Sequence, residues 1–538
     1  MASSSRHALP PARPRHRHSL SSTVVDESVA AAAVLVEKWH PDDDSKSLFL
    51  DGAGGEDYEP QRFLRAAADL HRAMLFFASD DDVSNDDGHG LVQAQALLQT
   101  AMRRLDQELQ LLLLHIDDDD ESTATASGSS GGCNKKEEDL RAVAEAMMAA
   151  GYGKECISTF KSRRRATLAT KLQRLLGFSL LPRRRPDEHH MMLQKLTWEQ
   201  VDGSIIPSWL NAATVAFNSL FPAEKHLCDA AFATSIDIGE AVFAAVANEQ
   251  ANGLLAVAEA AVARATRRRA PERLFRVLDV HHTLDTEVLP ALSSSSVFGA
   301  ADAEVISARA ARLVAKVREA ARATLDGLEA AIHKEPSKAT APGGAVHPLT
   351  RYVINYLVFL ADYHHQEEEE EDDDEMATMV IHHQRLARAL VGKLEAKAGC
   401  YRRHVALSYL FLANNTHYMA NKVDGSAKLR RILGEGWPEA QRAKARAHVE
   451  VYVRAAWGKV MAAAAIAGAA EGVEAAVMEA VGMQEEWVAA DEEMGQALRA
   501  AAMAAVVPKY RMFYRKYGAK VSLTPGDVTT MIAALFAT

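Results

Sequence analysis

The sequence predicts an all-α fold, and composition, hydrophobic periodicity and loop spacing each support this class. Hydrophobic residues form 48% of the 538 positions but aromatic residues only 6%, so Ala, Leu, Val and Met carry the apolar content, and as a group they favour helix over strand. From Glu137 to the C-terminus, apolar residues recur at helical spacing without strand-like alternation. Short connections between such segments force antiparallel stacking, and the chain is too long for one compact core. We therefore predict an elongated rod of consecutively stacked antiparallel helical bundles.

Residues 1–59 are predicted to form a disordered basic tail and one short helix. Residues 1–25 contain four arginines, several serines and no acidic residue, which is the composition of an organellar transit peptide. Three prolines in that segment disfavour an amphipathic helix, so a basic tail is the preferred interpretation. The short helix spans Val29–Trp39 and ends before Pro41 and a run of aspartates.

Residues 60–116 are predicted to form a pair of helices, and residues 117–136 a flexible linker. The linker sequence is acidic and then rich in Ser and Gly, a composition that behaves as flexible coil. The first helix begins near Pro60, and both helices carry an apolar stripe of helical period. The stripes consist of Phe63, Leu64, Ala67, Leu70 and Met74 in the first helix, and of Leu97, Leu98, Met102, Leu105, Leu109 and Leu112 in the second.

Middle helical bundles are predicted for residues 137–340, and C-terminal helical bundles with a basic tip for residues 341–538. Helices are separated near Pro186, at the serines before Val297 and at the segment PSKATAPGGA. The acidic runs Asp117–Glu121 and Glu367–Glu375 are expected to be solvated loops, because like charges repel and nothing apolar can pack there.

The stretch Val346–Tyr363 (VHPLTRYVINYLVFLADY) is the clearest single helix in the chain. Pro348 can start a helix without losing a backbone hydrogen bond, and Thr350 can cap the run that follows. Such a helix is apolar nearly all round and needs neighbours on several sides, so we expect it in the core. Its apolar stripe consists of Val353, Ile354, Tyr356, Leu357, Val358 and Leu360.

No pattern in the sequence predicts a catalytic residue, a cofactor or a metal ligand set, and nothing resembles a nucleophile elbow, a phosphate-binding loop or a dinucleotide fingerprint. No apolar run approaches the ~20 residues that a membrane-spanning helix needs. Adjacent histidines on a helix point about 100° apart and cannot chelate a metal together, so the four pairs are interpreted as surface or loop residues. The cysteines lie far apart without CxxC spacing, which favours a reducing compartment. The four histidine pairs are His189–His190, His281–His282, His364–His365 and His382–His383. The four cysteines are Cys133, Cys156, Cys228 and Cys400.

The enzyme alternative is an α-helical, Mg-dependent terpene synthase, because those plant enzymes are similar in size, all-α and hold Mg²⁺ with aspartate-rich motifs. Catalytic carboxylates must project from apolar helix walls into a dry cavity. The runs Asp80–Asp82, Asp117–Asp120 and Asp372–Asp374 lie instead among Ser, Asn, Gly and further acidic residues. We therefore predict solvated loops at these runs and no enzymatic activity.

Seven blocks follow one another along residues 60–538. They are LLQTAMRRLDQEL from Leu97, LRAVAEAMMAAGYGKECISTFKSRRRATL from Leu140, LTWEQVDGSIIPSWL from Leu196, APERLFRVLDVHHTL from Ala270, HPLTRYVINYL from His347, YLFLANNTHYMANKV from Tyr409 and VVPKYRMFYRKYG from Val506. In wording and order they resemble the plant branch of the seventy-kilodalton exocyst subunit family, a vesicle-tethering family. The resemblance implies an exocyst-type subunit that acts in exocytosis by binding membranes and proteins. It also implies a cytoplasmic protein, peripheral at the plasma membrane, with exocyst subunits as partners and no nucleic acid.

The resemblance further implies that the C-terminal end faces the membrane and binds phosphoinositide headgroups. The basic residues carried over are Arg511, Arg515, Lys516 and Lys520. The family has a longer KNPxKY-like loop here, whereas this chain has only RKYGAKVSLTP, so weak binding to anionic phospholipids is expected. Other basic clusters, at 161–165 (KSRRR), Arg183–Arg185 and Arg267–Arg269, are interpreted as wet faces of helices.

Family members begin with a long heptad-patterned helix that pairs with other subunits. Residues 1–28 hold three prolines, clustered Arg and Ser and almost no large apolar side chains, so we expect that this seam cannot form here. The alternative function is therefore a lineage-specific adaptor, for example in plant immunity, that has lost exocyst assembly.

Overall fold

The protein is described by a computed structural model in which every regular element is a helix. No strand occurs within the described ranges, which confirms the predicted all-α class. The description covers residues 22–43, 46–50, 58–79, 87–123, 131–178, 193, 195–267, 270–293, 297–336, 340–364, 373–401, 404–466 and 470–536. Residues 1–21 of the predicted tail, and the interpretations of Asp80–Asp82, Arg183–Arg185 and His189–His190, lie outside these residues. The helix predicted from Val29 begins at Ser22 instead, within the predicted tail.

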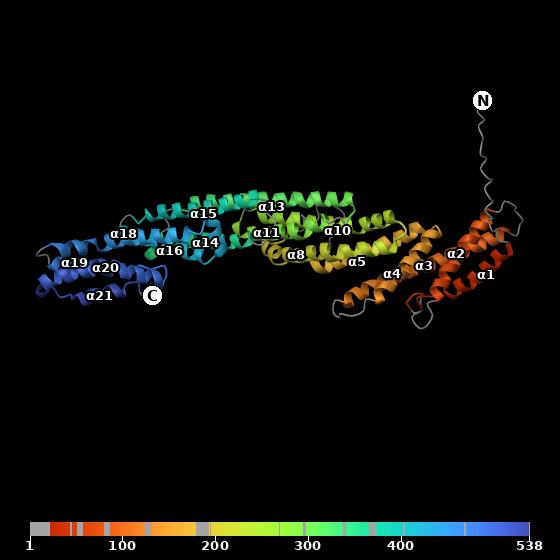
Figure 1. Cartoon of the computed structure of the whole chain (residues 1–538), viewed down its shortest axis with the longest axis horizontal. Helices are drawn as coiled ribbons and strands as arrows, with labels where there is room; N and C mark the ends of the chain where they lie inside the picture. Colours follow the sequence, from red (N-terminus) through yellow and green to blue (C-terminus); the bar gives the residue numbers. More distant parts are fainter. Residues whose placement is uncertain are drawn as a thin grey trace, which may run out of the picture. The chain divides into compact units, whose positions relative to one another are not determined.

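The chain divides into two compact units, Met1–Arg264 with Thr283–Val314, and Ala265–His282 with Ala315–Thr538. In the first unit, α1 packs on α2, α2 on α3, and α3 on both α4 and α5 (Figure 1). Its helices are α1 (Ser22–Lys38), α2 (Tyr58–Ser79), α3 (Asp87–Thr123), α4 (Gly131–Ala149), α5 (Gly153–Leu176), α7 (Trp198–Gln200), η2 (Val201–Ile205), α8 (Ile206–Val215), η3 (Ala216–Leu220), α9 (Phe221–Ala231), α10 (Ile236–Thr266), η5 (Leu284–Val288), α12 (Leu289–Ser293) and the first part of α13 (Ala300–Lys334).

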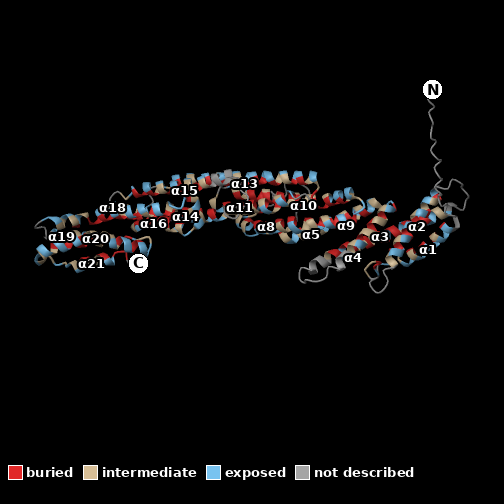
Figure 2. Cartoon of the chain, viewed as in Figure 1, coloured by how far each residue is buried: buried red, intermediate tan, exposed pale blue. Residues whose placement is uncertain are grey.

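The second unit is built around α16, which packs on α14, α15 and α18. Figure 2 shows the buried residues in red along the inner sides of its helices. Its buried apolar residues form two clusters. The helices of this unit follow one another in chain order. They are η4 (Pro271–Arg273), α11 (Leu274–Thr283), η6 (Pro342–Gly344), α14 (Pro348–His364), α15 (Asp373–Ala398), α16 (Val405–Asp424), α17 (Ala427–Leu433), α18 (Trp437–Ala465), α19 (Ala470–Gly482), α20 (Glu492–Tyr517), η7 (Gly518–Lys520) and α21 (Pro525–Ala534).

Helix α14 begins at Pro348, as predicted, and its apolar stripe lies in the core. The prediction that Thr350 caps this helix is wrong. Thr350 lies inside the first turn, and its buried hydroxyl donates to Asn415 Oδ1 at 2.6 Å. His347 takes the capping role instead, because its Nδ1 accepts the backbone N–H of Leu349 at 3.1 Å.

Two adjacent asparagines on α16, Asn414 and Asn415, are completely buried. The Asn414 amide donates to the carbonyl oxygens of Gly344 at 2.8 Å and Val488 at 2.7 Å, and its oxygen accepts the Ala490 N–H at 2.9 Å. Asn415 Oδ1 accepts the His347 N–H at 2.9 Å as well as the Thr350 hydroxyl. These bonds satisfy backbone groups that would otherwise be buried without a partner, so α16 fixes the start of α14 and the connection before α20.

In the first unit, one arginine of the KSRRR cluster is a buried structural residue. The Arg164 side chain of α5 is 3% exposed and binds Glu224 of α9 through two nitrogens, with Nε at 3.0 Å from Oε2. Its Nη1 also donates to Asp117 of α3 at 2.6 Å. The interpretation of this cluster as a wet helix face is therefore wrong for Arg164, since its carboxylate partners lie on two other helices.

The same contact corrects the predicted linker. Helix α3 continues through Asp117 to Thr123, and α4 already begins at Gly131. Asp117 is 15% exposed and paired with Arg164, so it is not part of a solvated loop. Similarly, α15 begins at Asp373, inside the acidic block that was expected to be a loop, while Glu367–Asp372 lies outside the described residues.

The interpretation of the histidine pairs as surface residues is wrong for His281, His382 and His383, which are buried on helices. His281 Nε2 lies 3.1 Å from Arg318 Nε. Burial lowers the pKa of His382, which keeps this imidazole neutral.

Within the part of the chain that the structure describes, no helix is long and apolar enough to cross a membrane.

The buried Arg164 contact predicts a large difference between two adjacent arginines. Replacing Arg164 by Ala should lower the free energy of unfolding by about 3–5 kcal/mol, because Glu224 would be left buried without its cation. Replacing Arg165, which pairs with Glu249 at a half-exposed position, should cost less than about 1 kcal/mol. Urea unfolding followed by circular dichroism measures both, and equal losses would contradict the structural role of Arg164.

Candidate functional site

The predicted lipid-binding residues lie together near the end of the second unit. Arg511, Arg515 and Lys516 are on the last turns of α20, and Lys520 ends η7. All four side chains are exposed, because the apolar face of α20 packs on α18 and α21. We call these four residues the C-terminal basic surface.

The loop that carries Lys520 is fixed by hydrogen bonds. Tyr510 donates its hydroxyl to the Leu523 carbonyl at 2.9 Å. Glu474 of α19 accepts the Leu523 N–H at 2.6 Å and the Ser522 hydroxyl at 2.9 Å. The Leu523 bond lowers the pKa of the Glu474 carboxyl, with smaller contributions from Ser522, so the carboxylate remains a charged acceptor. The short RKYGAKVSLTP segment is therefore held against α19 and α20.

The charges of the C-terminal basic surface are available to a ligand. None of its four side chains forms an ion pair or hydrogen bond with another described residue. Met512, which is 65% exposed, lies three and four positions before Arg515 and Lys516, so the three side chains are neighbours on the helix surface. An exposed apolar side chain among unpaired cations suits a surface that carries anionic headgroups.

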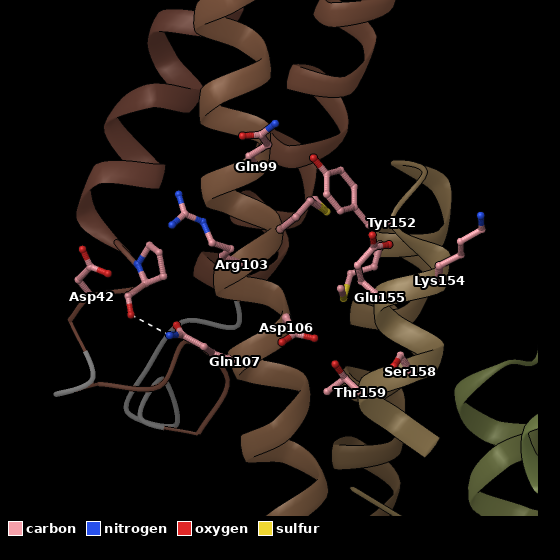
Figure 3. Close-up of a pocket in the computed structure, with 13 residues that line it drawn as sticks. Asp42, Gln99, Arg103, Asp106, Gln107, Tyr152, Lys154, Glu155, Ser158 and Thr159 are labelled. Atoms are coloured by element: carbon pink, nitrogen blue, oxygen red, sulfur yellow. Dashed lines mark hydrogen bonds between the residues drawn. The ribbon is translucent and has the colours of Figure 1, made fainter. Parts of the chain in front are cut away.

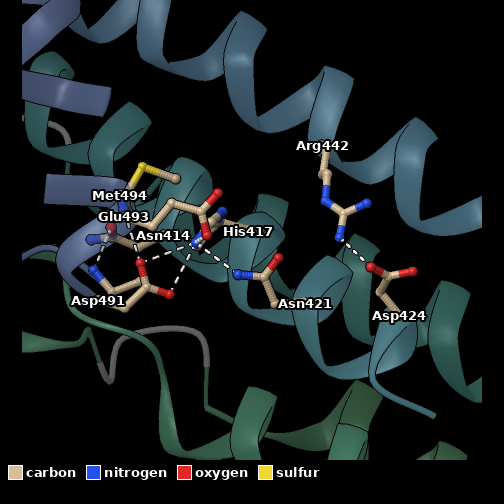
Figure 4. A network of polar contacts seen from close by, with 9 residues as sticks. Asn414, His417, Asn421, Asp424, Arg442, Asp491, Glu493 and Met494 are labelled. Carbon is tan, nitrogen blue, oxygen red and sulfur yellow. Dashed lines mark hydrogen bonds and ion pairs between the residues drawn. The ribbon is translucent and has the colours of Figure 1, made fainter. Parts of the chain in front are cut away.

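A second polar cluster ties α16 to the start of α20 (Figure 4). Asp491 caps α20 by accepting the Met494 N–H at 2.9 Å. His417 Nε2 lies 3.0 Å from Asp491 Oδ2, 3.0 Å from Asn421 Nδ2 and 3.8 Å from Glu493 Oε2. His417 is therefore a hydrogen-bonded histidine at the junction between α16 and the start of α20.

His417, Asp491 and Glu493 are also the only group of three among the described residues whose ligand atoms are close enough to hold a metal ion. Asp491 nevertheless uses its carboxylate to cap α20 and to contact His417, while Glu493 is 76% exposed. A helix cap joined to a neighbouring helix accounts for these contacts, so we assign no metal to them.

In the same view, Arg442 of α18 binds Asp424 of α16 at 2.6 Å and lowers the pKa of that carboxyl (Figure 4).

Sequence reasoning did not find an open pocket of about 700 Å³ in the first unit, beside α3 and the start of α5 (Figure 3). Its polar lining comes from residues far apart in the sequence, such as Asp42, Gln107 and Thr159. The only local signal is the polar sequence Asp106–Gln107–Glu108 inside the apolar stripe of α3, because polar residues within a stripe have to find partners.

Comparison with known protein families matches most of the described chain. The family model for the C-terminal part of Exo70, an exocyst complex subunit, matches residues 207–534, more than half of the chain. The model for the N-terminal part of the exocyst complex component Exo70 matches residues 28–115. The N-terminal model thus matches the earlier part of the chain and the C-terminal model the later part.

Curated relatives from Arabidopsis thaliana carry the same family name. Exocyst complex component EXO70B1 is 30% identical over 400 residues, which cover 70% of this chain and 61% of that protein. Exocyst complex component EXO70A1 is 26% identical over 559 residues, which cover 92% of this chain and 84% of that protein. The chain thus spans less than two thirds of the length of EXO70B1.

Solved structures of Saccharomyces cerevisiae Exo70 share the fold. One matches with a TM-score of 0.59 at 12% identity and covers 96% of this chain and 99% of the yeast chain. A crystal structure of the yeast exocyst component Exo70p matches with a TM-score of 0.57 at 12% identity. At this identity the structural match shows the fold alone, while the two matches along the sequence show the family. The chain belongs to the Exo70 family of exocyst complex subunits.

Proposed function

We propose that this protein acts in exocytosis as an exocyst-type subunit that binds membranes and proteins without catalysing a reaction. The observation that carries the proposal is the C-terminal basic surface, whose unpaired, exposed cations lie in the region that matches the Exo70 C-terminal model. The protein would work at the cytoplasmic side of the plasma membrane as a peripheral protein. Phosphoinositide headgroups are the anionic lipids that its arginines and lysines would contact.

The size of the charge set predicts weak binding. Each basic residue near an anionic membrane contributes about 1 kcal/mol, so four residues give about 4 kcal/mol, which corresponds to a dissociation constant of about 1 mM. Insertion of the Met512 side chain would add an apolar contribution of at most about 2 kcal/mol. Stable recruitment therefore needs a second contact, which an exocyst partner or another protein would supply.

The second candidate function is a lineage-specific adaptor, for example in plant immunity, that works apart from the exocyst. One observation favours it: the small number of cations in the C-terminal basic surface, which predicts weak membrane binding. In this function the helical surfaces bind other proteins, and lipid binding is secondary.

Liposome flotation tests the membrane contact. The variant R511A/R515A/K516A/K520A should lose binding to vesicles that contain phosphoinositides, and binding of the parent should fade above 0.1 M salt, where the screening length falls below ~10 Å. The matched control is K444A/R446A/R454A/K459A, which removes the same charge from exposed positions of α18 and should bind as the parent does. If the first variant still binds as tightly as the parent, the C-terminal basic surface is not the lipid site.

Affinity purification from plant tissue separates the two candidate functions. If the protein acts as an adaptor, recovery of other exocyst subunits should be poor. Stoichiometric recovery of the unaltered chain with the remaining subunits would favour tethering over the adaptor function.

A further inference from the structure

A carboxylate lies at the C-terminal basic surface, against the loop that carries Lys520. Glu474 Oε1 accepts the backbone N–H and the hydroxyl of Ser522, the hydroxyl at 2.9 Å. The same oxygen accepts the backbone N–H of Leu523 at 2.6 Å. Ser522 is two positions after Lys520, and two residues of chain span at most about 7 Å. The negative charge of Glu474 therefore lies within about 10 Å of the Lys520 backbone, which is one screening length at 0.1 M salt.

Nothing in the described part of the chain neutralises this carboxylate. Its three donors are uncharged, so they fix the position of the negative charge without cancelling it. Among the described residues, no cation lies within ion-pair distance of Glu474, whereas Glu479 on the same helix pairs with Lys459. Because the Leu523 bond lowers the pKa of the Glu474 carboxyl, this group is fully charged at neutral pH.

The charge of Glu474 also acts on α20, which carries the other cations of the surface. Helix α21 packs on both α19 and α20 (Figure 1). Burial raises the pKa of Tyr510 to about 12, and the nearby charge of Glu474 contributes to this increase. A smaller contribution comes from Asp527, in the capping box of α21. The residue after Tyr510 is Arg511, so Glu474 acts on the helix of the surface as well as on its loop.

We propose that Glu474 limits the affinity of the C-terminal basic surface for anionic headgroups. This inference rests on the proposed function and deepens it, because it concerns the same surface. A fixed negative charge repels a headgroup about as strongly as one lysine attracts it, so Glu474 offsets the attraction of about one of the four cations. The protein alone therefore leaves a membrane readily, and the second contact decides whether it stays.

The variant Glu474→Gln tests the charge and keeps the acceptor. Gln retains an oxygen that accepts from Ser522 and Leu523, so the loop keeps its hydrogen bonds while the charge is lost. In liposome flotation of the full chain, binding to phosphoinositide vesicles should rise about fivefold, the effect of one unit charge at an anionic surface. The gain should shrink above 0.1 M salt, because screening weakens a charge effect and leaves a packing effect unchanged.

Two further variants show whether the charge is the cause. The matched control is Glu240→Gln, which removes an exposed, unpaired negative charge from α10 in the first unit and should bind as the parent does. The variant Glu474→Ala removes the charge together with the acceptor and should also gain about fivefold. If Glu474→Ala gains affinity and Glu474→Gln does not, release of the loop is the cause and the proposal is overturned.

Combination with R511A/R515A/K516A/K520A separates this proposal from the proposed function. Without the four cations, Glu474→Gln should not restore binding, because the loss of one repulsive charge supplies no attraction. If the fourfold variant alone binds as the parent does, the proposed membrane contact fails. If the fourfold variant loses binding but Glu474→Gln, with all four cations present, binds no better than the parent, only the role of Glu474 is overturned.

Discussion

The second unit depends on the two asparagine side chains that α16 buries completely, Asn414 and Asn415. Each amide offers donors and an acceptor at fixed angles, and these bind backbone groups of the η6 turn, of the start of α14 and of the segment before α20. Such segments have no intrahelical partners for their backbone groups, and burying them without partners would be costly. The polar pair therefore makes it possible for three irregular segments to lie inside an apolar core, which sets where α14 and α20 begin.

Arginines in this chain have different roles according to the carboxylates on neighbouring helices. Arg164 is surrounded by Glu224 and Asp117, so its charge is compensated inside the first unit. Arg511 and Arg515 have the same side chain on an equally regular helix, but no acidic residue of the described chain lies within ion-pair distance of them. The first contributes to stability and the others remain available for anionic ligands.

The sequence by itself determined the helical class, the position of α14 and the apolar stripes of α2 and α3, because periodicity acts within a few positions along one helix. It did not determine which charged residues are buried. Asp117, expected in a solvated loop, meets Arg164 across 47 positions, and His417 meets Asp491 across 74. Likewise, the open pocket in the first unit is lined by Asp42, Gln107 and Thr159, which only the packing of the helices brings together. Such contacts depend on how helices pack in space, and a local pattern contains no information about a partner so far along the chain.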